Sequence, residues 1–557
     1  HISTGGDEAL CDLAKDAGYL TGIRGKVAHS TPYAFCPCGS GKKLKFCCRD
    51  LAPELEKMER MIEGEQYRAC LDHAEKLEQK HRGRVGLMVM MGRLHLYLKE
   101  HEEAHKLFDA VLEKEPDNTT ALAHRSTLKL MLRQVPEAIV DLQLALAAGR
   151  DPMPSDVFDA LELIAKVLTG AQMPMSARAH LQLTLASDPE GSGVSTFLNE
   201  IDRSIEDTLL LKDDPNLMPC PEGFASEDEF EEALWLARVG RWLIAEQHFA
   251  RLVEASPNVP ELWFNLGLVR GWLANNDGAV EAFRKYSVLD GVALEDALEA
   301  EALAQLLGPV TEKDRLPAIK VAHDINDSQR LLELLLSNKQ AWKLPDQGRN
   351  PDEGPPPTAV FRLLDRPQLT SAEGLSIDNI PNIIGQVSLF GKQTDRAARV
   401  EVIGIEGETF DQTEALVKEI AGDDLGEASG SEVVHPFAAM RGNFEPRWQL
   451  PEGTTREQAH ELVIEHGTDA LMNRWPETVT HALDEKTPLE AAKDDTLKFR
   501  VLAQLLISEL ATAEHTEKFD FNALREKLGL PKMEAIDPTT VDLTALPMCR
   551  WHRLEVE

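Results

Sequence analysis

Residues 260–290 read PELWFNLGLVRGWLANNDGAVEAFRKYSVLD, and this stretch decides the fold. Two amphipathic segments flank a short polar turn, which is the pattern of two helices joined by a turn. Ala279 in the second segment is small enough to let the two helices approach closely. Phe283, four residues later, is large enough to fill the groove beside it. The stretch therefore predicts a helix–turn–helix unit with a small and a large residue at its centre.

The same pair of positions recurs with a period of 34 residues. Ala245 and Phe249 precede Ala279 and Phe283 by one period. Nearer the start of the chain, the small and large positions are occupied by Cys70 and Ala74, Ala104 and Phe108, Ala138 and Leu142 and, after five inserted residues, Ala177 and Leu181. The repetition predicts two blocks of stacked helix pairs, residues 51–190 and 226–310.

A 34-residue helix–turn–helix period with the Trp, Leu, Gly, Ala and Phe skeleton of residues 260–290 resembles the tetratricopeptide repeat (TPR). That unit departs from the family at Arg270, where Tyr is usual, and at Gly291, where Pro is usual. The resemblance implies a mostly α-helical chain with a TPR-type α-solenoid.

In this family the first helix of each unit lines a concave groove that binds other proteins. The groove positions implied for the second block are Phe230, Leu234, Phe264, Leu268 and Trp272. These positions are mostly apolar, so the family's lysine–asparagine clamp for a peptide carboxylate is not expected. The groove would suit an apolar peptide or an amphipathic helix. Alternatively, the C-terminal third of the chain itself covers the groove.

Composition limits the classes of partner. The 557 residues carry a net charge of −35, which disfavours bulk attraction to nucleic acid or to an anionic membrane. Nowhere do 18 apolar residues run together, so no membrane span is expected. The first 30 residues are acidic and lack the apolar centre of a secretory signal. We therefore expect a soluble cytoplasmic protein.

Shifts in composition predict the remaining segments. We expect a short helix and a cysteine cluster in 1–50, and a linker in 191–225. A helix and a Pro/Gly-rich linker are expected in 311–357, and a small α+β unit holding almost all of the strands in 358–450. The remainder, 451–557, is expected to be a helical region with a tail.

The chemistry-bearing motif is FCPCGSGKKLKFCC at residues 35–48. Cys36, Cys38, Cys47 and Cys48 provide four thiolates, the ligand set of a closed tetrahedral zinc site. The intervening residues must reverse direction to bring the two pairs together, and their glycines permit the backbone angles of that reversal. The motif predicts one bound Zn²⁺, held by a small knuckle that folds separately from the repeats.

The same residues resemble the SEC-C motif, the zinc-binding segment named after the bacterial translocase ATPase SecA. The family pattern is Cys-x-Cys, a Gly-Ser-Gly-Lys/Arg turn, and Cys-Cys or Cys-His, and every element is present here. The resemblance assigns the four ligand roles to these cysteines. It also implies docking on an acidic chaperone or on the ribosome, with no reaction of the module's own.

Basic residues surround the motif in an otherwise acidic chain. Lys42, Lys43, Lys45 and Arg49 occur close together in the sequence. Part of their charge offsets the formal −2 of a zinc ion bound by four thiolates. We expect their charged ends to reach solvent and to form a basic face for an acidic partner.

No catalytic motif stands out. Gly39-Ser-Gly-Lys-Lys lacks the spacing of a phosphate-binding loop, and His460 and His466 are six residues apart instead of the four that a zinc-binding helix requires. The favoured hypothesis is a bacterial, non-enzymatic adaptor or scaffold in which the knuckle and the repeats each bind a protein. The alternatives are an enzyme with an unrecognised site in 358–450 and a self-assembling repeat protein.

Overall fold

A computed structural model describes residues 33, 35–36, 38–149, 153–187, 192–204, 209–212, 216–309, 315–345, 356–392, 397–438, 445–512, 519–543 and 546–554. The helix expected within residues 1–30 lies outside these residues. The chain divides into two compact units, each described here by itself. The first comprises His1–Gly308, Ala503–Glu514 and Glu534–Glu557, and the second comprises Pro309–Leu502 and His515–Met533.

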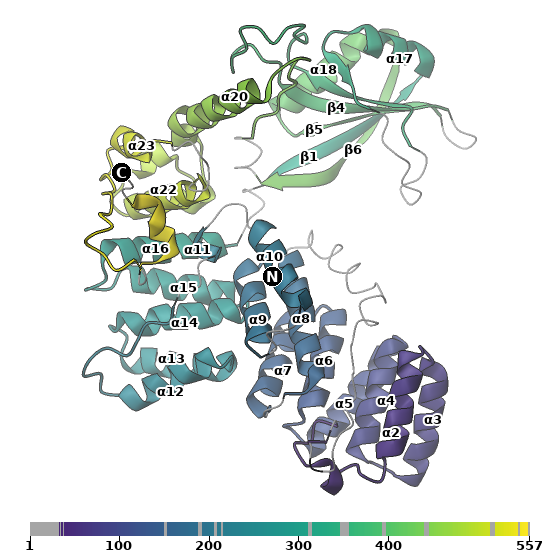
Figure 1. The fold of residues 1–557 in the computed structure, drawn as a ribbon. Coiled ribbons are helices and arrows are strands. Elements are labelled where there is room, and N and C mark those ends of the chain that lie inside the picture. Colours follow the sequence, from purple (N-terminus) through teal and green to yellow (C-terminus); the bar gives the residue numbers. More distant parts are fainter. Residues whose placement is uncertain are drawn as a thin grey trace. The chain divides into compact units, whose positions relative to one another are not determined.

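The first unit begins with a short 3₁₀ turn, η2 (Leu44–Phe46), followed by four antiparallel helix pairs. The pairs are α2 (Ala52–Glu63) with α3 (Tyr67–Lys80), α4 (Val85–Tyr97) with α5 (His101–Lys114), α6 (Thr119–Met131) with α7 (Val135–Ala148), and α8 (Ser155–Gly170) with α9 (Pro174–Ser187). Two further helices follow, α10 (Ser192–Ser204) and α11 (Leu209–Lys212). Figure 1 shows the helix pairs stacked side by side.

The second block of repeats lies in the same unit. It contains α12 (Glu227–Arg238), α13 (Trp242–Ala255), α14 (Pro260–Trp272), α15 (Asn276–Ser287) and α16 (Leu294–Leu307). The prediction of two helical repeat blocks is therefore confirmed.

The repeated sequence pattern marks the centre of each pair. All of the small and large positions named above are fully buried, from Cys70 and Ala74 to Ala279 and Phe283. Glycine on the first helix makes room for the phenylalanine of the second. A Cβ at Gly92 would lie 2.6 Å from Phe108, and one at Gly267 would lie 2.8 Å from Phe283. In these two pairs the groove that the phenylalanine fills is thus formed by a glycine backbone of the first helix.

The turns within the pairs repeat with the same period, although their residue types do not. Glu65, Lys99 and Arg133 have φ values of 56°, 59° and 63°, and they occupy the same position in three successive repeats. Ala274 has φ 58° and follows Gly240, whose φ is 78°, by one period in the second block. This left-handed backbone lets the chain reverse within a short turn, at a small cost in strain for the non-glycine residues.

The two blocks are joined through α9. The Ser176 hydroxyl donates to the Trp272 carbonyl at 2.6 Å, and the fully buried His180 ring meets the edge of Trp242 at 5.0 Å between ring centroids. The amide N–H of Leu243 donates to the Gln143 side chain at 3.1 Å. The second block thus packs on the side of the first.

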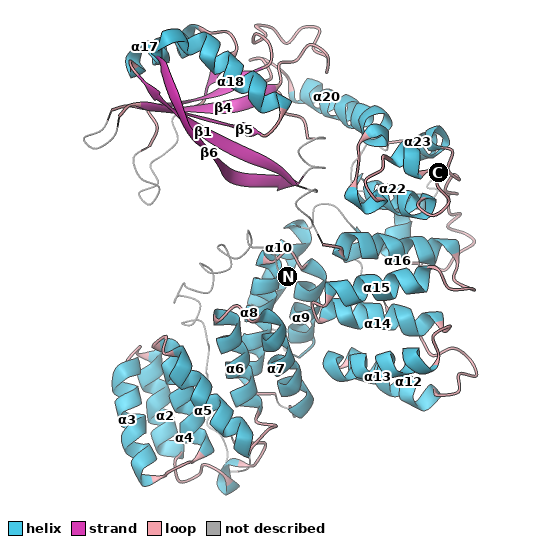
Figure 2. Cartoon of the chain, turned by 180° about the vertical axis from the view of Figure 1, so that it is seen from behind, coloured by secondary structure: helices cyan, strands magenta, loops and turns pink. Residues whose placement is uncertain are grey.

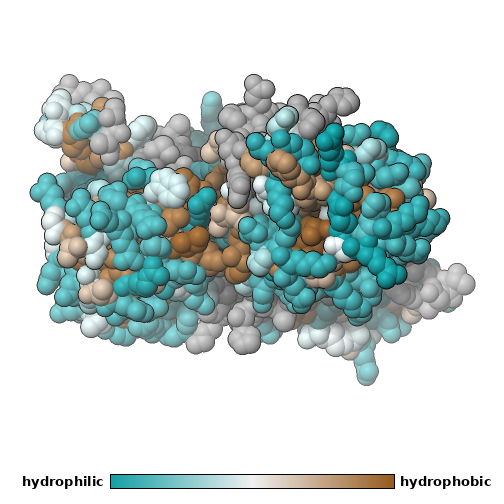
Figure 3. All heavy atoms as spheres, turned by 90° about the horizontal axis from the view of Figure 1, so that it is seen from below, coloured by the Kyte–Doolittle hydropathy of each residue, from teal (hydrophilic) through white to brown (hydrophobic). Residues whose placement is uncertain are grey.

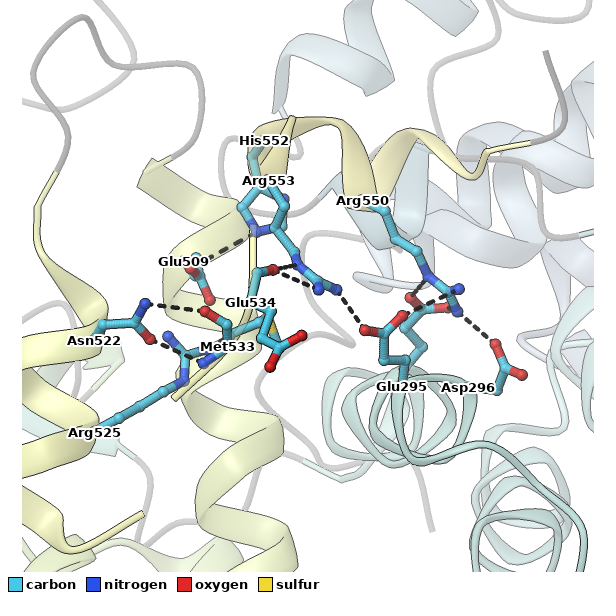
Figure 4. Close-up of polar contacts among 11 residues, drawn as sticks. Glu295, Asp296, Glu509, Asn522, Arg525, Met533, Glu534, Arg550, His552 and Arg553 are labelled. Atoms are coloured by element: carbon cyan, nitrogen blue, oxygen red, sulfur yellow. Dashed lines mark hydrogen bonds and ion pairs between the residues drawn. The ribbon is translucent and has the colours of Figure 1, made fainter. Parts of the chain in front are cut away.

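The C-terminal tail returns to the last repeat helix. The 3₁₀ helix η9 (Met548–Arg553) places Arg550 among Glu295, Asp296 and Glu299 of α16, with its Nε 2.5 Å from a Glu299 oxygen (Figure 4). Arg553 pairs with Glu295 at 2.9 Å and also donates to the Glu534 carbonyl. The acidic first turn of α16 is therefore neutralised by the end of the same chain.

The second unit is built on a six-stranded antiparallel sheet with strand order β2-β3-β4-β5-β1-β6. Helices α17 (Ser328–Ser337) and α18 (Glu408–Ala421) cover one face, as Figure 1 shows. A 3₁₀ turn, η5 (Gly422–Asp424), leads from α18 into the last strand. The strands are β1 (Arg315–Ile325), β2 (Ala341–Lys343), β3 (Ala359–Leu364), β4 (Ile383–Phe390), β5 (Arg399–Ile405) and β6 (Leu425–Ala438).

Two of these strands correct the predicted boundaries. Strands β1 and β2 lie within 311–357, where only a helix and a linker were expected, so the restriction of strands to 358–450 is wrong. Strand β1 is internal and pairs with both β5 and β6. Pro317 lies near the start of β1, a position that a strand tolerates, and its carbonyl accepts a hydrogen bond from the N–H of Glu406. Among the described residues, Figure 2 shows strands only in this sheet.

Helices complete the chain. They are α20 (Arg456–Asp469), η6 (Ala470–Arg474), η7 (Trp475–Glu477), η8 (His481–Leu483), α21 (Pro488–Ala491), α22 (Lys498–Thr512) and α23 (Phe521–Leu528). In the described part of the chain, no helix combines the length and apolarity that a membrane span requires. Figure 3 shows one face on which hydrophilic residues predominate and hydrophobic ones gather toward the middle.

Candidate metal centre and repeat groove

The four cysteines of the motif meet at one point. Their sulfur atoms all lie within 4.8 Å of one another. Cys36, Cys38 and Cys48 are buried, and Cys47 is half-buried. A tetrahedral zinc ion with Zn–S distances of about 2.3 Å places its sulfurs about 3.8 Å apart. The separations of 3.5 Å from Cys38 to Cys47 and 3.7 Å from Cys47 to Cys48 fit such an ion.

The backbone between the two pairs forms the predicted reversal. Gly39 and Gly41 have φ values of 78° and 67°, which glycine adopts without strain. The N–H of Cys36 donates to the Lys42 carbonyl at 2.7 Å, and the N–H of Cys47 donates to the Leu44 carbonyl at 3.1 Å. These bonds close the knuckle, residues 35–48, around the four sulfurs.

Each thiol of the cluster shifts the pKa of its neighbours. Contact with Cys36 raises the pKa of Cys38 and of Cys48, and the same neighbour lowers the pKa of Cys47. The Ser40 hydroxyl also lies 3.2 Å from the Cys47 sulfur. Four thiolates this close repel one another, so all four are deprotonated together only beside a cation. The donor set therefore fits a thiophilic divalent ion.

The knuckle is attached to the first-block helices by hydrogen bonds. The Asn118 side chain donates to the Cys38 carbonyl at 2.9 Å, and the N–H of Thr119 donates to the Gly39 carbonyl at 3.2 Å. A Cβ on Gly39 would lie 2.5 Å from the Asn118 oxygen. Arg84, at the start of α4, donates to the Cys47 carbonyl at 2.7 Å. The knuckle thus docks at the N-terminal ends of α4 and α6.

The knuckle also shares its hydrophobic core with these helices. A Cβ on Gly86 would lie 2.8 Å from the Cys48 sulfur. One continuous buried cluster contains Cys36, Cys38, Leu44 and Cys48 together with Leu51, Leu55, Met58, Ile62, Cys70, Leu71, Ala74, Leu77, Leu87, Met90 and Leu94. The expectation of a knuckle with a core separate from the repeats is therefore wrong. Because the knuckle is too short to form a core of its own, its sulfurs are buried against the neighbouring helices.

The basic residues next to the cysteines reach solvent to different degrees. Lys42, Lys43 and Arg49 are exposed, and Lys45 is half-buried. Lys42 pairs with Glu115, the residue that follows α5, at 2.9 Å. The Lys45 ammonium lies 3.9 Å from the ring centroid of Tyr33 and 4.5 Å from that of Phe46.

These two rings were not identified from the sequence. Tyr33 is 64% exposed and Phe46 is 72% exposed, so the face around Lys45 is aromatic as well as basic. Their closeness to the cysteines in the sequence could have marked them as part of the docking face. Asn118, Gly86 and Arg84 gave no signal, because they come from distant parts of the chain.

The predicted groove residues lie mainly inside the second block. Phe230, Leu234 and Leu268 are buried in the chain, and their contact with a partner remains a prediction. Phe264 is half-buried against Phe283 and Tyr286, and Trp272 is half-buried against Trp242. Their apolar character reflects packing between helices and against the chain's own residues.

The fold and the site together define a class: a mostly α-helical TPR-type solenoid with a cysteine cluster able to hold a metal ion, followed by a smaller sheet unit. Residues 89–154 match the family model "Tetratricopeptide repeat". This part of the first block is thus similar to the tetratricopeptide repeat family. No curated protein matches the sequence.

Two solved structures are similar to parts of the chain. One is YrrB, a TPR protein with an unusual peptide-binding site, at 18% identity and a TM-score of 0.19. That match covers 41% of this chain and 97% of YrrB. The other is Naa15/Naa10 bound to HypK-THB, at 17% identity and a TM-score of 0.19, covering 46% of this chain and 39% of the other.

Proposed function

We propose that this chain is a non-enzymatic adaptor that binds zinc through Cys36, Cys38, Cys47 and Cys48 and binds proteins through the knuckle and the repeats. The observation that carries the proposal is the four-sulfur cluster, whose sulfurs lie within 4.8 Å of one another and which is attached to a repeat scaffold. The SEC-C resemblance of residues 35–48 supports zinc and a docking role. Tetratricopeptide repeats support protein–protein interaction.

X-ray absorption at the zinc edge tests the metal assignment. The expected spectrum fits four sulfur ligands at about 2.3 Å. A fit that requires nitrogen or oxygen ligands would show that the four cysteines are not the complete set. A cytoplasmic location is part of the proposal, because a reducing compartment keeps such thiols free to bind metal.

The docking surface that we propose is the knuckle face around Lys43, Lys45 and Arg49. It suits an acidic protein, such as an acidic chaperone or an acidic ribosomal surface, because the chain as a whole carries a net charge of −35 and repels such a partner elsewhere. Lys42 contributes less, since Glu115 already neutralises it. Exposed Tyr33 and Phe46 add apolar contact area beside the charges.

A pull-down with charge-reversed protein tests this surface. Replacing Lys43, Lys45 and Arg49 by Glu is expected to abolish capture of the acidic partner while the zinc content stays unchanged. Reversal of Lys76, Lys80 and Lys106, which are exposed on α3 and α5, is the matched control. Capture that survives reversal at the knuckle, and that also survives high salt, would move the docking site to the repeats.

A further inference from the structure

The chain segment that precedes the second block lies on that block as an extended peptide. Residues 216–222 have no helix or strand, and a turn at Gly223 leads into α12. Within the described part of the chain, Asn216–Cys220 form no backbone-to-backbone hydrogen bond. Pro219 and Pro221 favour this open conformation, since proline cannot donate to a ladder.

One side chain of α14 holds the backbone of this segment. The N–H of Met218 donates to the Asn265 Oδ1 at 2.7 Å, and the Asn265 Nδ2 donates to the Met218 carbonyl at 2.9 Å. Asn265 is fully buried, so these two bonds satisfy an amide that would otherwise be costly to bury. A paired contact to one residue's N–H and C=O recognises extended backbone whatever its side chain.

Three side chains of the segment supply apolar contact. Leu217, Cys220 and Phe224 pack, half-buried, against the core of the second block. The Phe224 ring meets the edge of Phe230 at 5.8 Å between centroids. Phe230 is one of the positions that the sequence assigned to the peptide groove. The segment therefore covers a surface where a partner peptide was expected.

We propose that residues 216–224 are an internal ligand of the second repeat block, and that the block's partner is an extended apolar peptide that takes their place. The partner's backbone is held by Asn265, and its apolar side chains occupy the positions of Leu217, Cys220 and Phe224. Burial raises the pKa of the Cys220 thiol, and the nearby carboxylates of Glu227, Glu231 and Glu261 raise it further. Because these carboxylates are negative, a neutral or basic peptide binds better than an acidic one.

Tethering decides the competition. Because the internal segment is covalently joined to α12, its effective concentration at the block is on the order of millimolar, so a free peptide of equal intrinsic affinity binds the intact chain poorly. A natural partner overcomes this by tighter contacts or by engaging the knuckle at the same time. The second block is thus autoinhibited until such a partner arrives.

A fluorescent peptide with the sequence of residues 214–225 tests the proposal. It is expected to bind the full chain carrying Leu217→Ser and Met218→Pro at least tenfold more tightly than the unmodified chain. These changes weaken the internal segment and leave the helices intact. Adding Asn265→Ala to the opened chain is expected to remove the gain, whereas adding Asn258→Ala, an exposed residue of the α13–α14 connection, is expected to preserve it.

Hydrogen exchange of the unmodified chain gives an independent readout, should the opened variant not fold. The amides of Leu217–Phe224 are expected to exchange by a local opening, faster than those of α12 and α14. Three results would each overturn the proposal: no peptide binding to a folded opened variant, binding indifferent to Asn265→Ala, or exchange of the segment only on unfolding of the block. None of these would affect the zinc centre or knuckle docking, which have their own tests.

Discussion

Gly86 lies against the four-cysteine cluster, at a point where a side chain would collide with Cys48. Its added Cβ would be 2.8 Å from the Cys48 sulfur and 3.5 Å from the Cys38 Cβ. Gly86→Ala is therefore expected to push the knuckle away from α4, to lower stability by about 1–3 kcal/mol and to speed zinc loss to a chelator. Thermal unfolding and chelator kinetics measure the two effects.

Gly64→Ala is the matched control for that substitution. An added Cβ at Gly64 has only ordinary contacts, at 3.5 Å or more, and its φ of −88° suits any residue. Equal effects of the two substitutions would contradict the role assigned to Gly86.

The side chain of Asp159 on α8 lies where its charged form is disfavoured. Burial, with help from Asp156 and Glu162, raises its pKa to about 7, and its buried Oδ2 has no hydrogen-bond partner. Because the folded pKa exceeds the unfolded value of 3.8, the native state binds more protons between these values. Stability is therefore lost as pH rises from about 4 to about 7.

Asp159→Asn mimics the protonated form at every pH. The variant is expected to be more stable than the unmodified chain at pH 8, and its advantage should shrink by about 2 kcal/mol at pH 5. Urea unfolding at the two pH values measures this difference, and Asp290→Asn, at an exposed position of the other block, is the control. An advantage independent of pH would exclude titration of Asp159 as the cause.

At the scale of elements, the knuckle and helices α2–α4 form one folding unit. Their common buried cluster runs from Cys36 to Leu94. Cys47→Ser, or chelation of the metal, is expected to raise hydrogen exchange across α2–α4 and to leave α12–α16 unchanged. The physical reason is that metal binding energy is folding energy for residues that lack a core of their own.

Cys220→Ser is the control for that experiment, because Cys220 is a half-buried thiol outside the cluster. Unchanged exchange in α2–α4 after complete metal removal would contradict the shared core. That result would indicate that the knuckle folds independently of the helices, as the sequence had suggested.

The tail helix η9 is held on α16 by ion pairs of Arg550. Arg550→Ala leaves Glu295, Asp296 and Glu299 close together without their common cation. It is expected to release residues 546–554 to proteases and to cost about 1–2 kcal/mol. Lys106→Ala, which breaks an exposed pair with Glu103, should have no measurable effect. Equal protease resistance of the tail in both variants would contradict the role of Arg550.

Features that are local in the sequence were predictable, and features that depend on distant residues were not. Cys70, Ala104 and Ala138 repeat at one spacing and are all fully buried. The four cysteines belong to one short motif, so their meeting required only a reversal at Gly39 and Gly41. The contact of Asn265 with Met218 joins two distant parts of the chain, and no periodicity reveals it.

The same distinction explains what the sequence left open or misassigned. Phe230 and Leu268 occupy apolar positions of first helices, and an apolar residue there serves an open groove or a covered one equally well. Strand β1 was missed because residues 311–357 were assigned as a whole to a helix and a linker, on the prolines and glycines that follow β2. The partner strands β5 and β6, which define β1, lie much further along the chain, beyond β2, β3 and β4.

At the scale of the whole molecule, the basic and aromatic face around Lys43 and Lys45 contrasts with a net charge of −35. The first unit holds the knuckle, the repeats and the tail that binds α16, and the second unit holds the sheet. The proposed docking role requires that this face keep a fixed shape. A metal ion bound by the four cysteines would provide it, because the cysteines lie on both sides of Lys43 and Lys45 in the sequence.

The zinc content of freshly purified, reduced protein tests this central claim most directly. Elemental analysis after dialysis is expected to give one zinc per chain, and close to none when Cys36 and Cys48 are replaced by Ser. The loss should not be reproduced by replacing Cys70 and Cys549, which are buried cysteines that are not among the four predicted ligands. A zinc content near zero in the unmodified reduced chain would contradict the account.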